Sequence, residues 1–172
     1  PWLLLLLVLL ATALVFAPGL DGEFVWDDWA LIVRNQLVRD PAHLPDVLTS
    51  PFWNVSSQST VGRLAYLNLY RPFISLAYVT QFQVFGESPL GYHVLSLVVH
   101  LASVGLAFLW LRRRLGGDGA AAGLAAAVGI LPFALHSSRP ESVTWISGST
   151  DLWMTFWTLA GVVALAQPRL LT

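Results

Sequence analysis

The sequence predicts an all-α membrane protein: a polytopic bundle of about four transmembrane helices with a long first loop outside the cytoplasm. Of its 172 residues, 56% are hydrophobic, and the mean hydropathy is +0.66. Charged residues make up only 11%, whereas soluble domains carry about 25%. Several apolar runs also approach the roughly 20 residues that a spanning helix needs.

The composition argues against several other classes of protein. All nine basic residues are arginine and the formal net charge is -1, which disfavours a general nucleic-acid-binding surface. The chain has no cysteine, so disulfide frameworks and cysteine-based zinc sites are excluded. No phosphate-binding glycine loop, nucleophile elbow or internal repeat is present.

The first apolar run, residues 1–17, predicts the first transmembrane helix. Because it is shorter than a full span, we expect it to be clipped and the chain to be the N-terminal fragment (residues 1–172) of a larger protein. A signal peptide is the alternative interpretation, since the leucine-rich run resembles its apolar region.

Three further apolar runs predict the remaining spans: residues 90–111, 119–135 and 152–166. The first of them is followed by Arg112, Arg113 and Arg114. In the second, Gly119 and Gly123 form a spacing of small residues that allows close helix packing.

Residues 72–85 are apolar but too short to span, so an interfacial helix is expected within an external loop of residues 18–89. Arginine-rich short loops favour the cytoplasm. If residues 72–85 do not span, residues 112–114 and Arg169 lie in the cytoplasm, together with both termini. The loop at residues 136–151 then shares the external face with the first loop.

Asp27 and Asp28 form an acidic pair between Trp26 and Trp29. Tryptophan rings settle at membrane boundaries, so carboxylates held there lie near lipid head groups. The pair is interpreted as a general base or a divalent-metal ligand acting on a substrate with a lipid tail and a phosphate. The alternative is a solvated pair in which Asp28 caps the following helix.

Arg71 precedes Pro72, a residue suited to the first turn of a helix. An arginine beside a helix N-terminus favours a phosphate site. The alternative is an arginine that extends from the lipid boundary into water.

The second predicted span carries four polar residues on one helical face: His93, Ser96, His100 and Ser103. Such a face is expected to point into the bundle or a wet cavity. Hydrogen bonding between helices is the alternative, and metal binding by two histidines seven residues apart is weakly indicated.

The last loop holds four ionisable residues: His136, Arg139, Glu141 and Asp151. Glu141 is interpreted as supporting a site or as pairing with Arg139. Elsewhere, Asn54-Val55-Ser56 matches a glycosylation acceptor pattern, which is weak evidence because it is short.

Taken in order, five segments resemble a known family: FVWDDWALIVRN, PFW, YRPFISLAY, FGESPLGYHVLSLVVH and FALH…E…VTWISGSTD. They are similar to the N-terminal half of transmembrane O-mannosyltransferases that carry tetratricopeptide repeats (TPR). More broadly, they resemble the GT-C superfamily of glycosyltransferases, which use lipid-linked sugars. The resemblance covers about residues 22–166.

The resemblance implies roles for particular residues. Asp27 and Asp28 match the family's acidic pair, which contains the catalytic carboxylate, and Arg71 matches its basic residue before proline. The motif of the later loop is matched by His136, Glu141, Trp145, Ile146, Gly148 and Asp151. This chain departs from it at Ser137, Arg139 and Ser149.

The resemblance implies a GT-C glycosyltransferase that moves a sugar, expected to be mannose, from a polyprenyl-phosphate donor. The acceptor is a hydroxyl, of a protein serine or threonine or of a glycan, at the extracytoplasmic face. Asp27 would be the base. Arg71, Arg139, His136, Glu141 and His93 would bind the donor phosphate or substrate. No cofactor is expected, with a divalent metal at Asp27 and Asp28 as the alternative.

The implied location is the lipid bilayer of the inner membrane in a bacterium, or of the endoplasmic reticulum in a eukaryote. The fragment alone is expected to be inactive, and no nucleic-acid partner is expected. Two alternatives are a transporter or flippase segment and a non-catalytic membrane anchor of a repeat protein. Topology mapping at Gly86 separates enzyme from transporter, because the enzyme layout needs Gly86 outside.

Overall fold

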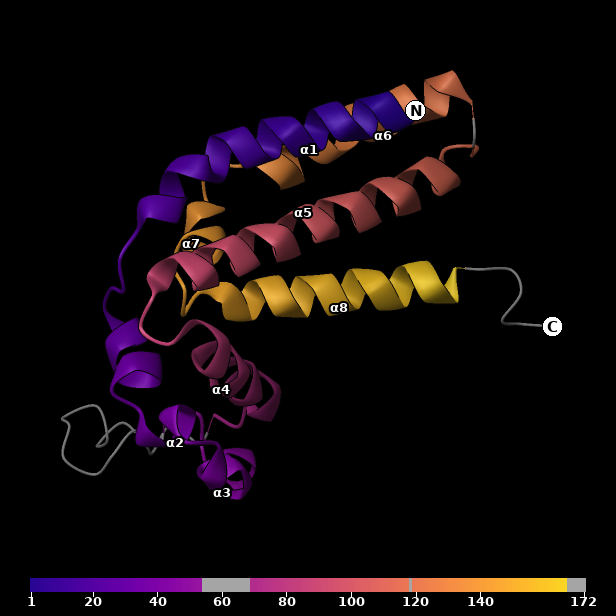
Figure 1. Ribbon diagram of the computed structural model, residues 1–172. Helices are drawn as coiled ribbons and strands as arrows, with labels where there is room; N and C mark the ends of the chain where they lie inside the picture. The colour runs from indigo at the N-terminus through magenta and orange to yellow at the C-terminus, as the bar shows by residue number, and fades with distance from the viewer. Residues whose placement is uncertain (54–68, 118, 167–172) are drawn as a thin grey trace. The chain divides into compact units, whose positions relative to one another are not determined.

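The computed structural model describes residues 1–53, 69–117 and 119–166 (Figure 1). Those residues form helices and connecting turns, and none of them is in a β-strand. The predicted all-α class is therefore confirmed for the described part of the chain. The Asn54 acceptor pattern lies outside the described residues.

The chain divides into two compact units. One consists of Pro1–Gly22 and His93–Thr172, and the other of Glu23–Tyr92. The first unit contains the long apolar helices, whereas the second contains the acidic pair and the short helices. We call them the long-helix unit and the loop unit.

The long-helix unit is built from α1 (Trp2–Phe16), α5 (Pro89–Arg114) from His93 onward, α6 (Ala120–Leu135), α7 (Pro140–Val143) and α8 (Ser149–Leu165). A 3₁₀ turn, η1 (Ala17–Asp21), extends α1. Among the described residues, two helices are long and apolar enough to cross a membrane: Trp2–Asp21 and Pro89–Arg114. At 26 residues, α5 is about 39 Å long, which exceeds the roughly 30 Å of a bilayer core.

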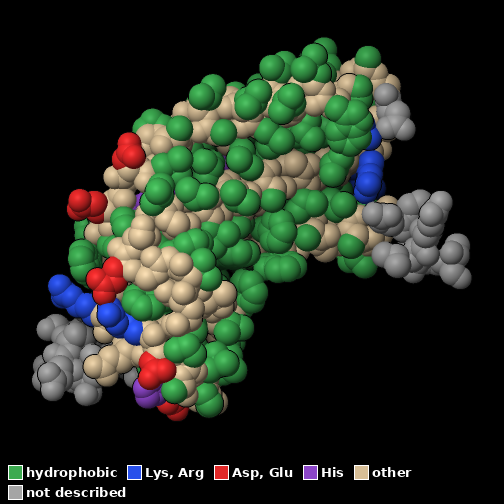
Figure 2. Space-filling model, viewed as in Figure 1, with side chains coloured by type: hydrophobic (Ala, Val, Ile, Leu, Met, Phe, Trp, Pro, Cys, Tyr) green, Lys and Arg blue, Asp and Glu red, His purple; other side chains and the backbone are tan. Residues whose placement is uncertain are grey.

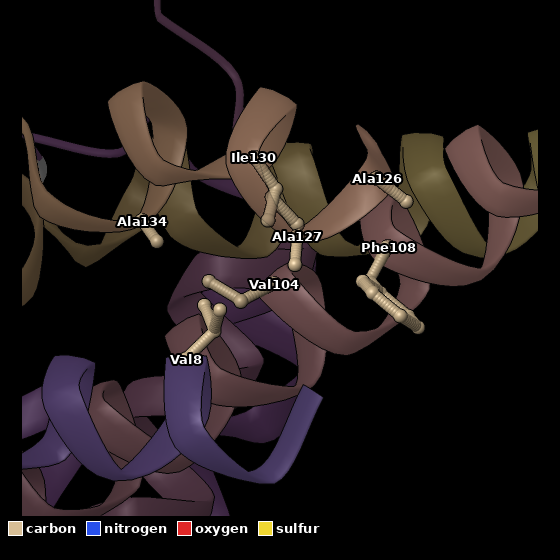
Figure 3. Close-up of a cluster of buried hydrophobic side chains, with 7 residues drawn as sticks. All are labelled: Val8, Val104, Phe108, Ala126, Ala127, Ile130 and Ala134. Atoms are coloured by element: carbon tan, nitrogen blue, oxygen red, sulfur yellow. The ribbon is translucent and has the colours of Figure 1, made fainter. Parts of the chain in front are cut away.

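Small residues let the helices of this unit approach closely. In Figure 1, α1 runs alongside α6. Between these helices and α5 lies a buried cluster (Figure 3) formed by Val8, Val104, Phe108, Ala126, Ala127, Ile130 and Ala134. A Cβ atom added at Gly123 would lie 2.8 Å from Pro1 Cβ, whereas one at Gly119 would meet nothing within 4 Å. Of the two predicted small residues, Gly123 is therefore the one at a close contact.

Large hydrophobic side chains remain exposed along the same helices, and Figure 2 shows hydrophobic side chains spread over much of the visible surface. They include Leu6, Leu10, Leu14, Val94, Val98, Leu124, Val128, Met154 and Trp157. Soluble proteins rarely expose apolar surface of this extent. Together with the two long helices, this surface indicates a membrane protein.

The loop unit contains η2 (Trp29–Val33), α2 (Gln36–Arg39), η3 (Pro41–His43), α3 (Leu44–Thr49) and α4 (Pro72–Phe85). The helix expected at residues 72–85 is observed as α4 with the same bounds. Proline stands at its first position, where a missing N–H costs nothing. The helix ends at Gly86, whose φ of 58° suits glycine.

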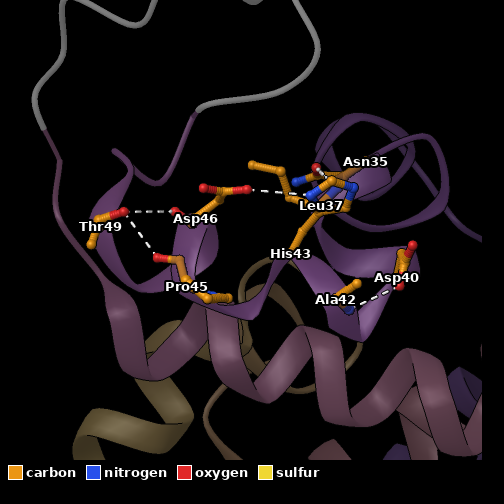
Figure 4. A network of polar contacts seen from close by, with 8 residues as sticks. All are labelled: Asn35, Leu37, Asp40, Ala42, His43, Pro45, Asp46 and Thr49. Atoms are coloured by element: carbon orange, nitrogen blue, oxygen red, sulfur yellow. Dashed lines mark hydrogen bonds and ion pairs between the residues drawn. The ribbon is translucent and has the colours of Figure 1, made fainter.

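Side-chain caps start two of the short helices of the loop unit, α2 and η3 (Figure 4). Asn35 Oδ1 accepts the N–H of Leu37 at 3.1 Å, and Asp40 Oδ1 accepts that of Ala42 at 2.8 Å. Each bond satisfies a donor that the first turn leaves open. Arg39 links α2 to the end of α4, because its guanidinium lies 2.7 Å from Glu87 and its carbonyl accepts from Gln83.

Candidate functional site

The acidic pair lies in a tight turn that begins at Val25. The N–H of Asp28 donates to the Val25 carbonyl at 3.0 Å, and the N–H of Val25 donates to Asp28 Oδ2 at 2.9 Å. The Asp28 side chain is 0% exposed, whereas Asp27 is half-buried. In this turn the Asp28 carboxylate therefore binds the backbone, whereas the Asp27 side chain lies at the tip.

This geometry corrects the interpretation of Asp28 as a helix cap. Asp28 does stand at the N-cap position of η2, but its side chain makes no cap hydrogen bond. It turns back instead to the N–H of Val25. The physical reason is that the preceding turn leaves that partly buried N–H without a backbone acceptor, and the Asp28 carboxylate supplies one.

The following residues hold the turn from its other side. Trp29 Nε1 donates to the Phe24 carbonyl at 2.9 Å, and the two rings meet edge to face with centroids 6.1 Å apart. Phe24 also packs against Tyr92 at 5.3 Å. The exposed Arg34 lies over the Trp29 ring at 5.3 Å. Trp29 therefore helps to order the backbone beside the acids as well as suiting a membrane boundary.

Burial and charge both act on Asp27. Partial burial raises the pKa of its carboxyl above the ordinary value, and the nearby charge of Asp28 raises that pKa further. A carboxylate with a raised pKa binds a proton more readily. This property suits a general base.

Trp26 adopts a backbone conformation that is unusual for its type. Its φ is 46°, the one positive φ of a non-glycine residue in the described chain, and its side chain is 79% exposed. Non-glycine residues in this region cost of order 1–3 kcal/mol and gather at functional sites. Trp26 immediately precedes Asp27, so the strain lies in the turn that presents the carboxylate.

We expect Trp26→Gly to raise the free energy of unfolding by about 1 kcal/mol, because relief of strain exceeds the added freedom of glycine in the unfolded chain. Trp26→Ala is the matched control, since it also removes the indole but keeps the strained φ. Thermal unfolding of the detergent-solubilised protein measures both variants. Equal stabilisation by alanine and glycine would show that the indole, not the backbone, is responsible.

Arg71 lies directly before α4, at its N-cap position, as the sequence predicted. Its guanidinium stands over the Phe52 ring at 5.3 Å, and the side chain is exposed. The first turn of α4 begins with Pro72, which has no N–H, and the N–H groups of Ile74 and Ser75 both donate to the Arg71 carbonyl at 3.1 Å. The helix dipole still places partial positive charge at this end of α4. Arg71 and the helix start thus offer positive charge in the same unit as the acidic pair.

The polar face of α5 points into the long-helix unit, which confirms the predicted orientation. Its four residues, His93, Ser96, His100 and Ser103, are all buried. Ser103 Oγ donates to the Val99 carbonyl within α5, whereas His100 Nε2 lies 3.1 Å from the Ala134 carbonyl of α6. At His100, therefore, the expected alternative of a bond between helices is observed.

His93 lies against the end of the first helical segment. A Cβ atom at Gly22 would come within 2.9 Å of His93 Nε2. A side chain at residue 22 would therefore require the His93 ring to shift. The structure places His93 inside the long-helix unit, and its role in binding substrate stays a prediction.

The last loop holds its polar residues close to the end of α6. His136 Nδ1 accepts the Ser138 N–H at 3.2 Å. Arg139 stacks on Phe133 with its guanidinium carbon 4.6 Å from the ring centroid. Glu141 opens α7, and the described part of the chain shows no ion pair between Arg139 and Glu141. The structure thus gives no support to the alternative in which these two residues neutralise each other.

The predicted site residues divide between the two units. The loop unit carries Asp27, Asp28 and Arg71, whereas the other unit carries His93, His136, Arg139 and Glu141. Their meeting in one site stays a prediction. No group of three metal-ligating side chains occurs in the searched, described residues, and metal dependence is likewise untested.

Sequence reasoning missed Val25 and Phe133. Val25 contributes its backbone alone, so no side-chain pattern points to it. Phe133 stands six residues before Arg139 in an ordinary apolar helix, and its aromatic ring was the one available signal of a cation–π partner.

Comparison with known proteins gives a consistent set of relatives. A protein O-mannosyl-transferase of Caenorhabditis elegans is 30% identical over 165 residues, which are 95% of this chain and 23% of that protein. The protein O-mannosyl-transferase TMTC4 of Mus musculus is 27% identical, over 94% of this chain and 22% of the relative. Its human counterpart is 31% identical over 80% of this chain and 19% of the relative.

These relatives confirm the resemblance to protein O-mannosyltransferases. The chain spans less than a quarter of the length of the relatives it matches (23%, 22% and 19%). No family model matches the chain. No solved structure matches it either.

Proposed function

We propose that the chain forms the N-terminal part of a GT-C protein O-mannosyltransferase, which transfers mannose from a polyprenyl phosphate to a serine or threonine hydroxyl. The relatives support the reaction class, because three of them from worm, mouse and human carry the name protein O-mannosyl-transferase. The observation that carries the proposal is the Val25–Asp28 turn. It holds one carboxylate buried and presents the other with a raised pKa.

In the proposed reaction Asp27 is the catalytic base. Its carboxylate takes the proton of the acceptor hydroxyl, and the hydroxyl oxygen then attacks the anomeric carbon of the sugar. The bond between that carbon and the phosphate oxygen breaks, and its electron pair leaves with the polyprenyl phosphate. Phosphate is a good leaving group, so one carboxylate suffices, in contrast to hydrolases with two.

The departing phosphate gains one negative charge, and arginines are suited to stabilise it. Arg71 offers a guanidinium beside the start of α4, and a helix N-terminus also attracts anions. Arg139 offers a second guanidinium, whose central carbon lies over the Phe133 ring at 4.6 Å from the centroid. A planar guanidinium binds phosphate with two parallel hydrogen bonds. His136, Glu141 and His93 are proposed to contact the substrate.

Asp28 is proposed to be a positioning residue. Its carboxylate accepts the Val25 N–H, so it sets the direction in which Asp27 points. Its charge also raises the pKa of Asp27. We propose no metal at the pair, because one of the Asp28 oxygens is already engaged in this backbone bond.

We further propose four membrane spans, at α1, α5, α6 and α8, with both termini in the cytoplasm. The arginine-rich end of α5 favours that side, and Figure 2 shows basic atoms where α5 ends. The loop unit and the loop after α6 then face the opposite side, where a lipid-linked sugar presents its head group. The bilayer explains the location of the acids, since a polyprenyl phosphate cannot leave the membrane.

The pH dependence of transfer follows from the raised pKa of Asp27. The base must be ionised, so activity is expected to fall on acidification through a pKa higher than that of an ordinary aspartate. Asp28→Asn keeps an acceptor oxygen for the Val25 N–H but removes the neighbouring charge, which lowers the pKa of Asp27. The fall of the transfer rate on acidification (the acid limb of the pH profile) should therefore move to lower pH. Rates of mannose transfer across a pH series measure both. An acid limb that does not move would mean that Asp28 does not act on the base.

The experiment that tests the proposed function uses the full-length protein in membranes. A labelled polyprenyl-phosphate mannose is supplied, and transfer of label to protein is followed. Transfer that requires Asp27 supports the proposal. Absence of transfer from mannose and from other lipid-linked sugars would overturn it in favour of a membrane anchor, and movement of the donor without transfer would favour a flippase.

A further inference from the structure

We propose that His100, a buried histidine of α5, is a positioning residue that holds Arg139 at the start of the last loop. The inference rests on the proposed function, in which Arg139 stabilises the phosphate of the donor. In this proposal a residue of the polar face of α5 positions a substrate-binding side chain in addition to packing between helices. The contacts that carry it all lie within the long-helix unit.

The first contact joins α5 to the last turn of α6. His100 Nε2 lies 3.1 Å from the carbonyl oxygen of Ala134, and the histidine is 0% exposed. Helix α6 ends one residue later at Leu135, so this carbonyl belongs to the last turn, whose acceptors lack partners within the helix. The chain then leaves the helical pattern, since the Ser138 and Arg139 N–H groups both turn to His136. His100 thus satisfies an open acceptor at the point where the loop begins.

The contact also determines the protonation of the ring. A carbonyl oxygen can only accept, so Nε2 must carry the proton and donate it. The ring is held in place by Phe16 on α1, at a centroid distance of 5.3 Å, and by Phe133 on α6 at 5.9 Å. His100 is therefore a hydrogen-bond donor whose ring is held between two aromatic side chains.

The second contact leads from His100 to Arg139 through Phe133. One ring contact joins His100 to Phe133, and the Arg139 guanidinium stacks on the same phenyl ring at 4.6 Å. His100 consequently holds both the backbone that precedes the loop and the ring that supports the arginine. A shift of about 1 Å in a substrate-binding group is enough to lower catalysis by about 100-fold.

The activity test compares three variants of the full-length protein in membranes. His100→Leu removes the donor at similar bulk, and we expect it to lower kcat/KM for the donor by about 10- to 100-fold. His100→Gln places an N–H near the position of Nε2 and should restore most of the activity. Ser103→Ala is the matched control, because its buried hydroxyl donates to the Val99 carbonyl within α5, and it should leave activity unchanged.

A double-mutant cycle separates positioning from general damage to the fold. If His100 acts through Arg139, adding His100→Leu to Arg139→Ala should lower kcat/KM little further, because the arginine is already absent. If the double variant lost kcat/KM by the product of the two single losses, the proposal would be overturned. Full activity of His100→Leu would overturn it as well.

A third measurement does not depend on activity. Because residues 1–172 contain no cysteine, Ser138→Cys introduces a labelling site next to Arg139, and peptide mapping distinguishes it from any cysteine elsewhere in the full-length protein. His100→Leu should speed its reaction with a water-soluble maleimide by about 3- to 10-fold, the effect of losing one hydrogen bond on loop opening. His100→Gln should reverse this. Unchanged labelling would overturn the positioning role, whereas changed labelling without any mannose transfer would contradict the proposed function alone.

Discussion

Replacing Asp27 with asparagine is expected to lower mannose transfer by about 10²- to 10⁴-fold, the range that a general base contributes. The amide keeps the size and the hydrogen-bonding groups of the side chain but cannot take the proton of the acceptor. The measurement is transfer of label from polyprenyl-phosphate mannose to protein, by the full-length wild type and variant in membranes.

The same substitution should leave the protein folded. Because the pKa of Asp27 is raised in the folded state, the folded state binds the proton more readily than the unfolded chain, and its stability falls as pH rises through that pKa. Asparagine does not ionise, so the variant lacks this fall in stability. It should be at least as stable as the wild type near pH 7. An unfolded variant would instead assign Asp27 a structural role.

A matched control is available in Asp21, an exposed carboxylate at the end of η1. Asp21→Asn removes one negative charge near the same boundary without touching the turn, and transfer should be unchanged. Full activity of Asp27→Asn would end its assignment as the base. Equal losses in both variants would point to a general effect of charge at the membrane surface.

Replacing Arg71 with alanine should produce the second large effect, a fall in transfer rate of about 10²- to 10³-fold. This is the loss typical when one group that stabilises developing charge is removed. Arg71→Lys should recover part of the rate, because lysine keeps the charge but not the planar fork that binds two phosphate oxygens. Initial rates over a series of donor concentrations would show the loss mainly in kcat.

Arg34→Ala is the control for Arg71. Arg34 is also exposed and also stacks on an aromatic ring at 5.3 Å, in this case Trp29, so its removal reproduces the loss of a cation–π contact. Transfer by this variant should stay near that of the wild type. If Arg71→Ala were no worse than Arg34→Ala, Arg71 would be an arginine at the lipid boundary, the alternative that its sequence context also allows.

Local features of the chain were sufficient to predict α4 and the polar face of α5. Pro72 and Gly86 mark the two ends of α4, since a proline suits a first turn and a glycine accepts the positive φ that ends it. Steps of three and four residues place the four polar residues of α5 on one side. Both signals depend on residues only a few positions apart, so they can be recognised without knowledge of the rest of the fold.

The two acids could not be told apart in this way. Asp27 and Asp28 are neighbours of the same type, and the sequence favours a helix cap for Asp28 as readily as a base. The difference arises from the turn, in which Asp28 Oδ2 receives the Val25 N–H and Trp26 takes a φ of 46°. No glycine marks that positive φ, so the pattern that normally predicts such a turn is absent.

The sequence by itself determined the membrane character, the all-helical class and the resemblance to O-mannosyltransferases. Hydropathy, helix ends and the order of motifs can all be read from residues that are close together in the chain. The tertiary structure alone decided that Asp28 is buried, that Asp27 is presented, and that His100 contacts a carbonyl 34 residues away. Contacts over such a separation depend on how helices pack, and the turn that encloses Asp28 determines which of the two neighbouring carboxylates is buried.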